Sequence, residues 1–232
     1  MPSGAVVVAA GRSQRMGFNK TLAMLGGRPI LRHVLDLLES INEISEIIVV
    51  TSADNFDAVQ SLIDERSPET RIGLCLGGDT RQESVERGVA ALAISIDLVL
   101  IHDAARPLVT ADIVREGIRR ASESGAAIAA IPVSDTIKMV TPDGRVERTP
   151  NRSRLYAAQT PQVFRRDWLE ASYARVHAVR ETVPFTDEAS LLEWAGYIVH
   201  AFAGSPQNLK LTHPVDLVVA EAILGWRRGR EQ

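Results

Sequence analysis

The sequence is poor in cysteine, aromatic residues and net charge. Its 232 residues include one cysteine and 5% aromatic residues, and the formal net charge at pH 7 is −3. Cys75 therefore cannot form a disulfide within the chain, which favours core packing for its side chain and a reducing compartment, the cytoplasm, for the protein. The charge balance argues against a broad nucleic-acid or anionic-membrane surface, so we predict neither partner.

Long hydrophobic runs are also missing. None approaches the ~20 apolar residues that a membrane span needs. The apolar stretch near the N-terminus is interrupted by Arg12 and has no basic residue before it, so we expect no signal peptide. With 45% hydrophobic residues, the chain can still bury a sizeable core. We predict a single domain over residues 1–232.

Short β-branched runs alternate with amphipathic stretches. This pattern predicts strands at residues 5–10, 46–51, 71–76, 97–102 and 126–133, and helices at residues 29–41, 54–66, 80–93 and 110–124. The strands are continuously apolar, which indicates burial on both faces. We therefore predict a Rossmann-like α/β fold, a mostly parallel sheet with helices on both faces. Ligands should gather at the carboxyl ends of its strands.

The rhythm breaks in a polar stretch at residues 134–159. Pro142-Asp143-Gly144 at its centre predicts a turn between strands at residues 136–140 and 145–148, a β-hairpin that projects as an arm. An isolated hairpin is marginal in water, so the arm should pack on a second subunit; the alternative is packing on its own domain. The remaining pattern predicts helices at residues 166–180, 187–195 and 214–228, and strands at residues 197–202 and 208–211.

The first predicted strand leads into a phosphate-binding loop. Ala9, Ala10 and Gly11 bring no bulk, so the backbone can approach a ligand and direct its N–H groups at phosphate oxygens. Arg15 and Lys20 follow and supply positive charge. This arrangement indicates triphosphate binding.

Two better-known phosphate loops fit less well. The dinucleotide pattern G-x-G-x-x-G fails because Ser13 stands where its second glycine belongs. The G-x-x-x-x-G-K-[ST] loop fails on spacing, since five residues separate Gly11 from Gly17 and two more precede Lys20.

Two further groups follow predicted strands at the same edge of the sheet. In the glycine-rich segment at residues 77–85, Arg81 and Ser84 can donate hydrogen bonds to a ligand, although a helix start capped by Thr80 explains the segment equally well. At residues 102–107, Asp103 can hold a metal or a ribose and Arg106 an anion. The alternative is an Asp103–Arg106 pair that pins the loop. His102 is expected to be structural.

Three later features are weaker on their own. Lys210 lies on the predicted strand at residues 208–211, and a solvent-facing lysine is its plain interpretation. Thr160-Pro161-Gln162 can be a turn, and Thr186-Asp187 the N-cap of a helix. His213-Pro214 with Asp216 predicts the start of the last helix.

Taken together and in this order, the motifs resemble one family, the 2-C-methyl-D-erythritol 4-phosphate cytidylyltransferases. The shared patterns are Ala-Ala-Gly-x-x-x-Arg-Met, Gly-Gly-x-x-Arg-x-x-Ser-Val, His-Asp-Ala-Ala-Arg-Pro, Asp-Thr-Ile-Lys, Thr-Pro-Gln and Thr-Asp-Glu-Ala-Ser. The resemblance extends from residue 5 to residue 224. It implies transfer of a cytidylyl group from CTP to 2-C-methyl-D-erythritol 4-phosphate in the non-mevalonate isoprenoid pathway, with Mg²⁺ as cofactor and a homodimer joined by the arm.

The resemblance also implies roles for particular residues. Arg15, Lys20 and Lys210 match the catalytic residues, and Mg²⁺ is held mainly by the CTP phosphates, near Asp103. The nucleotide-binding positions correspond to Ala9, Ala10, Gly11, Gly78, Asp79, Ser84, Asp103 and Ala104. The positions that bind the acceptor phosphate, shared with the arm of the neighbouring subunit, correspond to Arg106, Thr136, Arg152, Thr160 and Thr186.

Other functions stay open at this stage. The segment before Lys20 is shorter than in many members of the family and lacks a proline just before the lysine. Ribitol 5-phosphate is the alternative acceptor, and a sugar-phosphate uridylyl- or guanylyltransferase would share the first loop. A P-loop-like phosphotransferase disagrees with the glycine-to-lysine spacing. A non-catalytic nucleotide-binding module has no need of Arg15, Lys20, Asp103 and Lys210 together.

Overall fold

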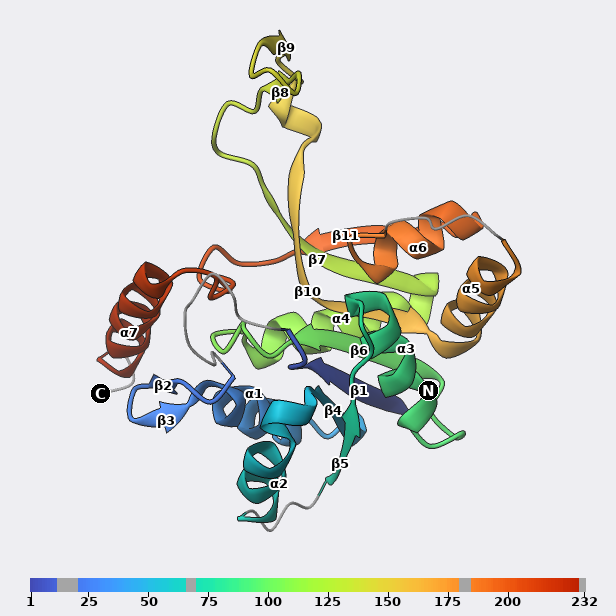
Figure 1. Cartoon of the computed structure of the whole chain (residues 1–232), viewed down its shortest axis with the longest axis vertical. Coiled ribbons are helices and arrows are strands. Elements are labelled where there is room, and N and C mark those ends of the chain that lie inside the picture. The colour runs from blue at the N-terminus through green and yellow to red at the C-terminus, as the bar shows by residue number, and fades with distance from the viewer. Residues whose placement is uncertain (12–20, 66–69, 180–184, 230–232) are drawn as a thin grey trace.

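A seven-stranded sheet organises the computed structural model, which describes residues 1–11, 21–65, 70–179 and 185–229 (Figure 1). The strand order is β11-β7-β10-β6-β1-β4-β5. The bounds are β1 (Ser3–Val8), β4 (Ile44–Thr51), β5 (Arg71–Leu76), β6 (Leu98–Asp103), β7 (Ala126–Pro132), β10 (Tyr156–Arg165) and β11 (His200–Ala203). Strand β10 runs antiparallel to β6 and β7, and the other described pairs within this sheet are parallel. The mostly parallel sheet is therefore confirmed.

Helices cover both faces of the sheet, as predicted (Figure 1). On one face lie α1 (Ile30–Glu39), α2 (Phe56–Asp64) and α4 (Ala111–Ser124); on the other lie α3 (Arg81–Ala91), α5 (Arg166–Ala178) and α6 (Glu188–Ala195). The consecutive residues Val6 and Val7 of β1 are both fully buried, in opposite core clusters. Continuous apolar strands arise in this way, because each face of the sheet needs its own core. Cys75 packs partly buried against one of these clusters.

A smaller cluster joins the C-terminal helix to the body. Helix α7 (Pro214–Arg228) packs beside the short strands β2 (Met24–Leu25) and β3 (Arg28–Pro29), which the sequence pattern did not predict. The predicted helix start is confirmed, because a carboxylate oxygen of Asp216 accepts the N–H of Thr212 at 2.6 Å and that of His213 at 2.7 Å. A single 3-10 turn (Ala53–Asn55) precedes α2.

Across the described ranges, no helix is long and apolar enough to cross a membrane.

The predicted hairpin projects from the body as an arm (Figure 1). Its tip contains β8 (Met139–Val140) and β9 (Val146–Arg148), and a 3-10 turn (Arg152–Arg154) leads back to the sheet. Gly144 supplies the left-handed conformation that the turn needs, with φ +85°, and its N–H donates to Thr141 O at 2.9 Å. Val140 and Val146 are exposed on this arm. The arm is thus shaped as predicted, with shorter strands.

Two local predictions were wrong. Residues 208–211 alternate like a strand but have no ladder partner; instead Asn208 donates to Thr160 O at 2.8 Å and Leu211 N–H to Ala105 O at 2.8 Å. Thr160-Pro161-Gln162 is not a turn but part of β10. The ladder with β7 is irregular between Ala158 and Gln162, so Pro161, which has no N–H, sits where no ladder bond is required.

Smaller differences concern boundaries. Strand β1 ends at Val8, before Ala9 and Ala10, and the strand expected at residues 197–202 runs instead from His200 to Ala203.

Candidate active site

Loops from three strands meet at the carboxyl edge of the sheet. The N–H of Ala104, which follows β6, donates to Val8 O at the end of β1 at 3.1 Å. Gly77, which follows β5, lies so close to Ala10 that a Cβ added at Gly77 would lie 2.6 Å from the Ala10 Cβ. Glycine is thus required at position 77 by the close approach of two loops. The structure brings the predicted nucleotide loop and the glycine-rich segment together.

The described part of the first loop ends at Gly11, which is exposed. Arg15 and Lys20 fall in residues 12–20, outside the described residues. Their catalytic roles stay predictions.

Asp103, the last residue of β6, is the centre of the site. The Lys210 Nζ lies 2.7 Å from its Oδ2. Two guanidinium groups are farther away, with Arg106 Nε 3.7 Å from Oδ2 and Arg81 Nη2 3.8 Å from Oδ1. The Asp103–Arg106 pair therefore exists, but as one contact of a four-residue cluster. One carboxylate faces three cations at the edge where ligands bind in such sheets.

Electrostatics keep Asp103 ionised. Burial by itself would raise the pKa of Asp103, but attraction to Lys210 and then to Arg81 outweighs burial and lowers the pKa to about 2. The Lys210 side chain stays 42% exposed while it contacts Asp103. Its ammonium group therefore keeps donors that can reach an incoming anion.

A second layer of polar groups holds the backbone of Asp103. The hydroxyl of Thr160 accepts the N–H of Asp103 at 3.0 Å and lies 3.1 Å from His102 Nδ1. The other ring nitrogen, Nε2, lies 3.2 Å from Arg106 O. His102 is fully buried, and this desolvation lowers its pKa to about 4, so the ring is neutral at pH 7. The structural role expected for His102 is confirmed.

Arg106 is buried, and its guanidinium group is held by a backbone carbonyl group. Its Nη1 donates to Asn208 O at 2.7 Å, and the Gln159 amide donates to Ser205 O at 2.9 Å in the same region. Burial lowers the pKa of Arg106, against the opposing attraction of Asp103. The segment that follows β11 is thus tied to the site, and this segment carries Lys210.

The N-terminal turn of α3 shapes the rim of the site. Thr80 caps the helix by accepting the Glu83 N–H at 3.1 Å, which confirms the predicted cap. The Ser84 hydroxyl accepts the Gly78 N–H at 3.1 Å, and Glu83 accepts the Asp79 N–H at 2.8 Å. Gly78, Asp79 and Ser84 therefore form one compact turn beside Gly77.

Sequence reasoning missed Glu188. This carboxylate is 1% exposed, and its Oε2 accepts from Arg81 Nη1 at 2.7 Å. Burial raises the pKa of Glu188, against the opposing attraction of Arg81. An acidic residue directly before the apolar start of α6 was the signal that could have revealed it.

The residues assigned to the acceptor separate into two groups. Arg106 and Thr160 lie beside Asp103, whereas Thr136 and Arg152 lie on the arm, where Arg152 Nη1 donates to Ser134 O at 2.7 Å (Figure 1). Thr186 is exposed, directly before the N-cap of α6. Within one chain, these residues do not form one pocket.

Asp103 offers a single carboxylate toward a metal ion. Within the part of the chain that the structure describes, no three His, Cys, Asp or Glu side chains are grouped as metal ligands. Mg²⁺ commonly binds through one or two carboxylates together with substrate phosphates, so one carboxylate at a nucleotide site fits this ion. The other ligands would come from the nucleotide.

Comparisons with known proteins agree on one family. The family model described as IspD, 2-C-methyl-D-erythritol 4-phosphate cytidylyltransferase, matches residues 4–226. The enzyme of that name from Dehalococcoides mccartyi strain CBDB1 is 42% identical, over 98% of this chain and 97% of its own length. The one from Alkaliphilus metalliredigens is 40% identical, over 98% and 95%.

A solved structure agrees in fold. The 4-diphosphocytidyl-2C-methyl-D-erythritol synthase of Anaerococcus prevotii superposes with a TM-score of 0.85 and 31% identity, covering 96% of this chain and 98% of its own. The family model and the named relatives define the chain as a nucleotidyltransferase. More particularly, the chain belongs to the family of 2-C-methyl-D-erythritol 4-phosphate cytidylyltransferases.

Proposed function

We propose that the protein transfers the cytidylyl group of CTP to 2-C-methyl-D-erythritol 4-phosphate, forming 4-diphosphocytidyl-2-C-methyl-D-erythritol and pyrophosphate for isoprenoid synthesis. Membership of the family supports this function. The structural observation that carries it is the cluster at the carboxyl edge of the sheet, where Lys210 lies 2.7 Å from Asp103.

The reaction needs charge stabilisation more than proton transfer. An acceptor phosphate oxygen is already anionic at neutral pH, so it attacks the α-phosphorus in line without a general base, and the pyrophosphate group leaves. The main barrier is repulsion between the two anions, which positioning and fixed positive charge overcome. We assign this stabilisation to Arg15, Lys20 and Lys210.

Nucleotide binding is assigned to the three loops at the sheet edge. The proposed contacts come from Ala9, Ala10, Gly11, Gly78, Asp79, Ser84, Asp103 and Ala104. Mg²⁺ bound to the CTP phosphates, beside Asp103, would neutralise charge on the triphosphate. The ionised carboxylate of Asp103 suits this place.

The acceptor site is proposed to be shared between two subunits. Arg106, Thr160 and Thr186 belong to the body, whereas Thr136 and Arg152 would come from the arm of a second copy. Support comes from the arm itself, which projects from the body and exposes Val140 at 56% and Val146 at 55% (Figure 1).

Sedimentation tests the proposed dimer. We expect a dimer for the wild type and a monomer for Val140→Asp, with unchanged helical circular dichroism. The control is Ile94→Asp, since Ile94 is 89% exposed on the loop after α3 and should leave the dimer intact. A wild-type monomer, or an equal effect of both variants, would contradict the dimer arm.

The activity is tested by pyrophosphate release with Mg²⁺ and CTP, comparing 2-C-methyl-D-erythritol 4-phosphate with ribitol 5-phosphate, and CTP with UTP and GTP. Preference for CTP and the first acceptor is expected. Lys20→Ala should lower turnover ~100-fold, the usual effect of removing one transition-state donor. Release with ribitol 5-phosphate alone would reassign the acceptor, and release with neither would refute the function.

The cytoplasm is the proposed compartment. Its support is Cys75, the single cysteine of the chain, which suits a reducing environment.

A further inference from the structure

Arg81 links two carboxylates that come from distant parts of the chain. Its Nη1 lies 2.7 Å from Glu188 Oε2, and its Nη2 lies 3.8 Å from Asp103 Oδ1. Arg81 is the first residue of α3, Glu188 the first of α6, and Asp103 the last of β6. A guanidinium group presents its donors as a rigid fork, so one side chain addresses both carboxylates at once.

Helix capping does not account for Glu188. The N-cap of α6 is Asp187, whose Oδ1 accepts the Ser190 N–H at 3.0 Å and whose Oδ2 accepts from Gln162 at 2.8 Å. Glu188 is 1% exposed and stands next to the buried Ala189. Burying a carboxylate is costly unless it is paired, and Arg81 is the main partner of Glu188, ahead of a hydrogen bond from the backbone.

Arg81 lies closer to Glu188 than to Asp103. Asp103 contacts Lys210 at 2.7 Å, while Arg81 stands at 3.8 Å. Arg81 is 30% exposed and could close on Asp103 if nothing held it. An arginine fork that binds a carboxylate through two parallel hydrogen bonds competes strongly with a single ammonium group.

We propose that Glu188 is a positioning residue that holds Arg81 back from Asp103, so that Asp103 keeps Lys210 in place for nucleotidyl transfer. This inference rests on the proposed function, because Lys210 is there assigned to the reaction. Neither Glu188 nor Arg81 needs to touch the substrate for this effect. The proposal gives a role to Arg81 of the Gly-Gly-x-x-Arg motif and to Glu188 of the Thr-Asp-Glu-Ala-Ser motif, neither of which is among the residues assigned to binding.

The test compares Glu188→Gln with the matched control Glu46→Gln. Glu46 is also a buried carboxylate, 3% exposed, but it lies near the start of β4, at the opposite end of the strands from the site. For Glu188→Gln we expect kcat of pyrophosphate release to fall on the order of 100-fold, the effect of a displacement of ~1 Å at a reacting group. The KM for CTP should change far less. The control should keep wild-type kcat.

A double-mutant cycle separates positioning from general loss of structure. If Glu188 acts by restraining Arg81, Arg81→Gln alone should keep near-wild-type kcat, and adding it to Glu188→Gln should restore most of the kcat that Glu188→Gln loses. A double variant as slow as Glu188→Gln, or a wild-type kcat in Glu188→Gln, would overturn the proposal. If Glu188→Gln does not fold by circular dichroism, Glu188→Asp decides, because it keeps the charge but draws the carboxylate away from Arg81. Full kcat in Glu188→Asp would then overturn it.

The proposal and the proposed function fail differently. A wild-type protein that releases no pyrophosphate refutes the function and, with it, the assignment of Lys210. An active wild type whose Glu188→Gln variant keeps full kcat refutes the positioning role alone.

Discussion

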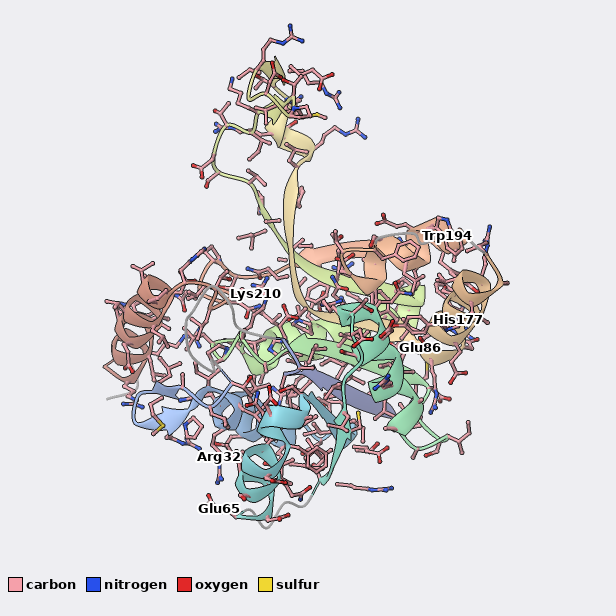
Figure 2. The ribbon with its side chains drawn as sticks, viewed as in Figure 1. Arg32, Glu65, Glu86, His177, Trp194 and Lys210 are labelled. Carbon is pink, nitrogen blue, oxygen red and sulfur yellow. The ribbon has the colours of Figure 1, made fainter. Side chains whose placement is uncertain are left out.

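Lys210 Nζ contacts Asp103 Oδ2 at 2.7 Å, although Asp103 ends a central strand and Lys210 lies on the segment that leads into α7 (Figure 2). Both side chains belong to the same chain, so the pair is part of the fold itself. The lysine is therefore held at the carboxyl edge of the sheet, where a triphosphate would bind. Such preorganisation avoids the cost of orienting the charge during the reaction.

The first prediction concerns this lysine. Lys210→Ala should lower kcat of pyrophosphate release ~100-fold, because one donor to the developing charge is lost. Stability should fall as well, because the buried Asp103 loses the closest of its cationic partners. Steady-state kinetics with CTP measures the effect. Arg119→Ala, on the outer face of α4, is the control and should keep wild-type kcat; equal loss in both variants would contradict the assignment.

The second prediction is an acid dependence of stability that comes from Asp103. Burial by itself would raise the pKa of Asp103, but attraction to Lys210 outweighs burial. The pKa is therefore lowered from an ordinary value of 3.8 to about 2. A carboxylate with a lowered pKa stabilises the fold above pH 4, and this contribution is lost as the pH falls toward 2. Over that range the wild type should lose up to about 2 kcal/mol more unfolding free energy than Asp103→Asn. Urea unfolding at pH 4.5 and 2.5 provides the comparison, and parallel curves for both proteins would refute it.

The third prediction concerns His102. Because burial lowers its pKa to about 4, the folded protein resists protonation that the unfolded chain accepts below about pH 6.5. Stability should therefore fall as the pH drops from about 6.5 to 4, by up to about 3 kcal/mol from this residue. Histidine NMR should show His102 still neutral at pH 5.5. Protonation of His102 near pH 6.5 would contradict the burial argument.

The fourth prediction concerns Thr160. Thr160→Val keeps the shape but removes the hydroxyl that accepts the Asp103 N–H and contacts His102. Leaving these buried groups without a partner should lower the unfolding free energy by about 1–3 kcal/mol. Thr160→Ser retains the hydroxyl and should keep most of the stability. Urea denaturation at pH 7 distinguishes the two; equal midpoints for Val and Ser would show that the hydroxyl does not matter.

Much of the fold was predictable because burial on both faces leaves a clear pattern. The apolar runs of β1 and β6 and the amphipathic period of α4 follow from position in the sheet or on its surface. Strand β10 was not predictable in the same way. It contains Pro161 and is interrupted within the ladder, so its sequence reads as a turn.

The residues of the candidate site were likewise predictable only in part. Asp103 and the glycines of residues 77–78 were predictable because they lie at the end of a strand or directly after one, and these strands end at the same edge of the sheet. Glu188 was not, because its partner Arg81 lies on another helix and only the tertiary structure brings them together. Lys210 received its role through the resemblance to the family, whereas the strand expected around it does not form.

The interruption in β10 also has a mechanical consequence. Ala158 pairs with Ala130 and Gln162 with Ile128, so Gln159, Thr160 and Pro161 stand opposite Ala129 alone. At this point side chains take the place of ladder bonds: the Gln159 amide donates to Ser205 O at 2.9 Å, and the Thr160 hydroxyl accepts the Asp103 N–H at 3.0 Å. Both residues are buried. The base of the arm is therefore fastened to the strand end that carries Asp103, so the arm and the candidate site share one set of buried hydrogen bonds.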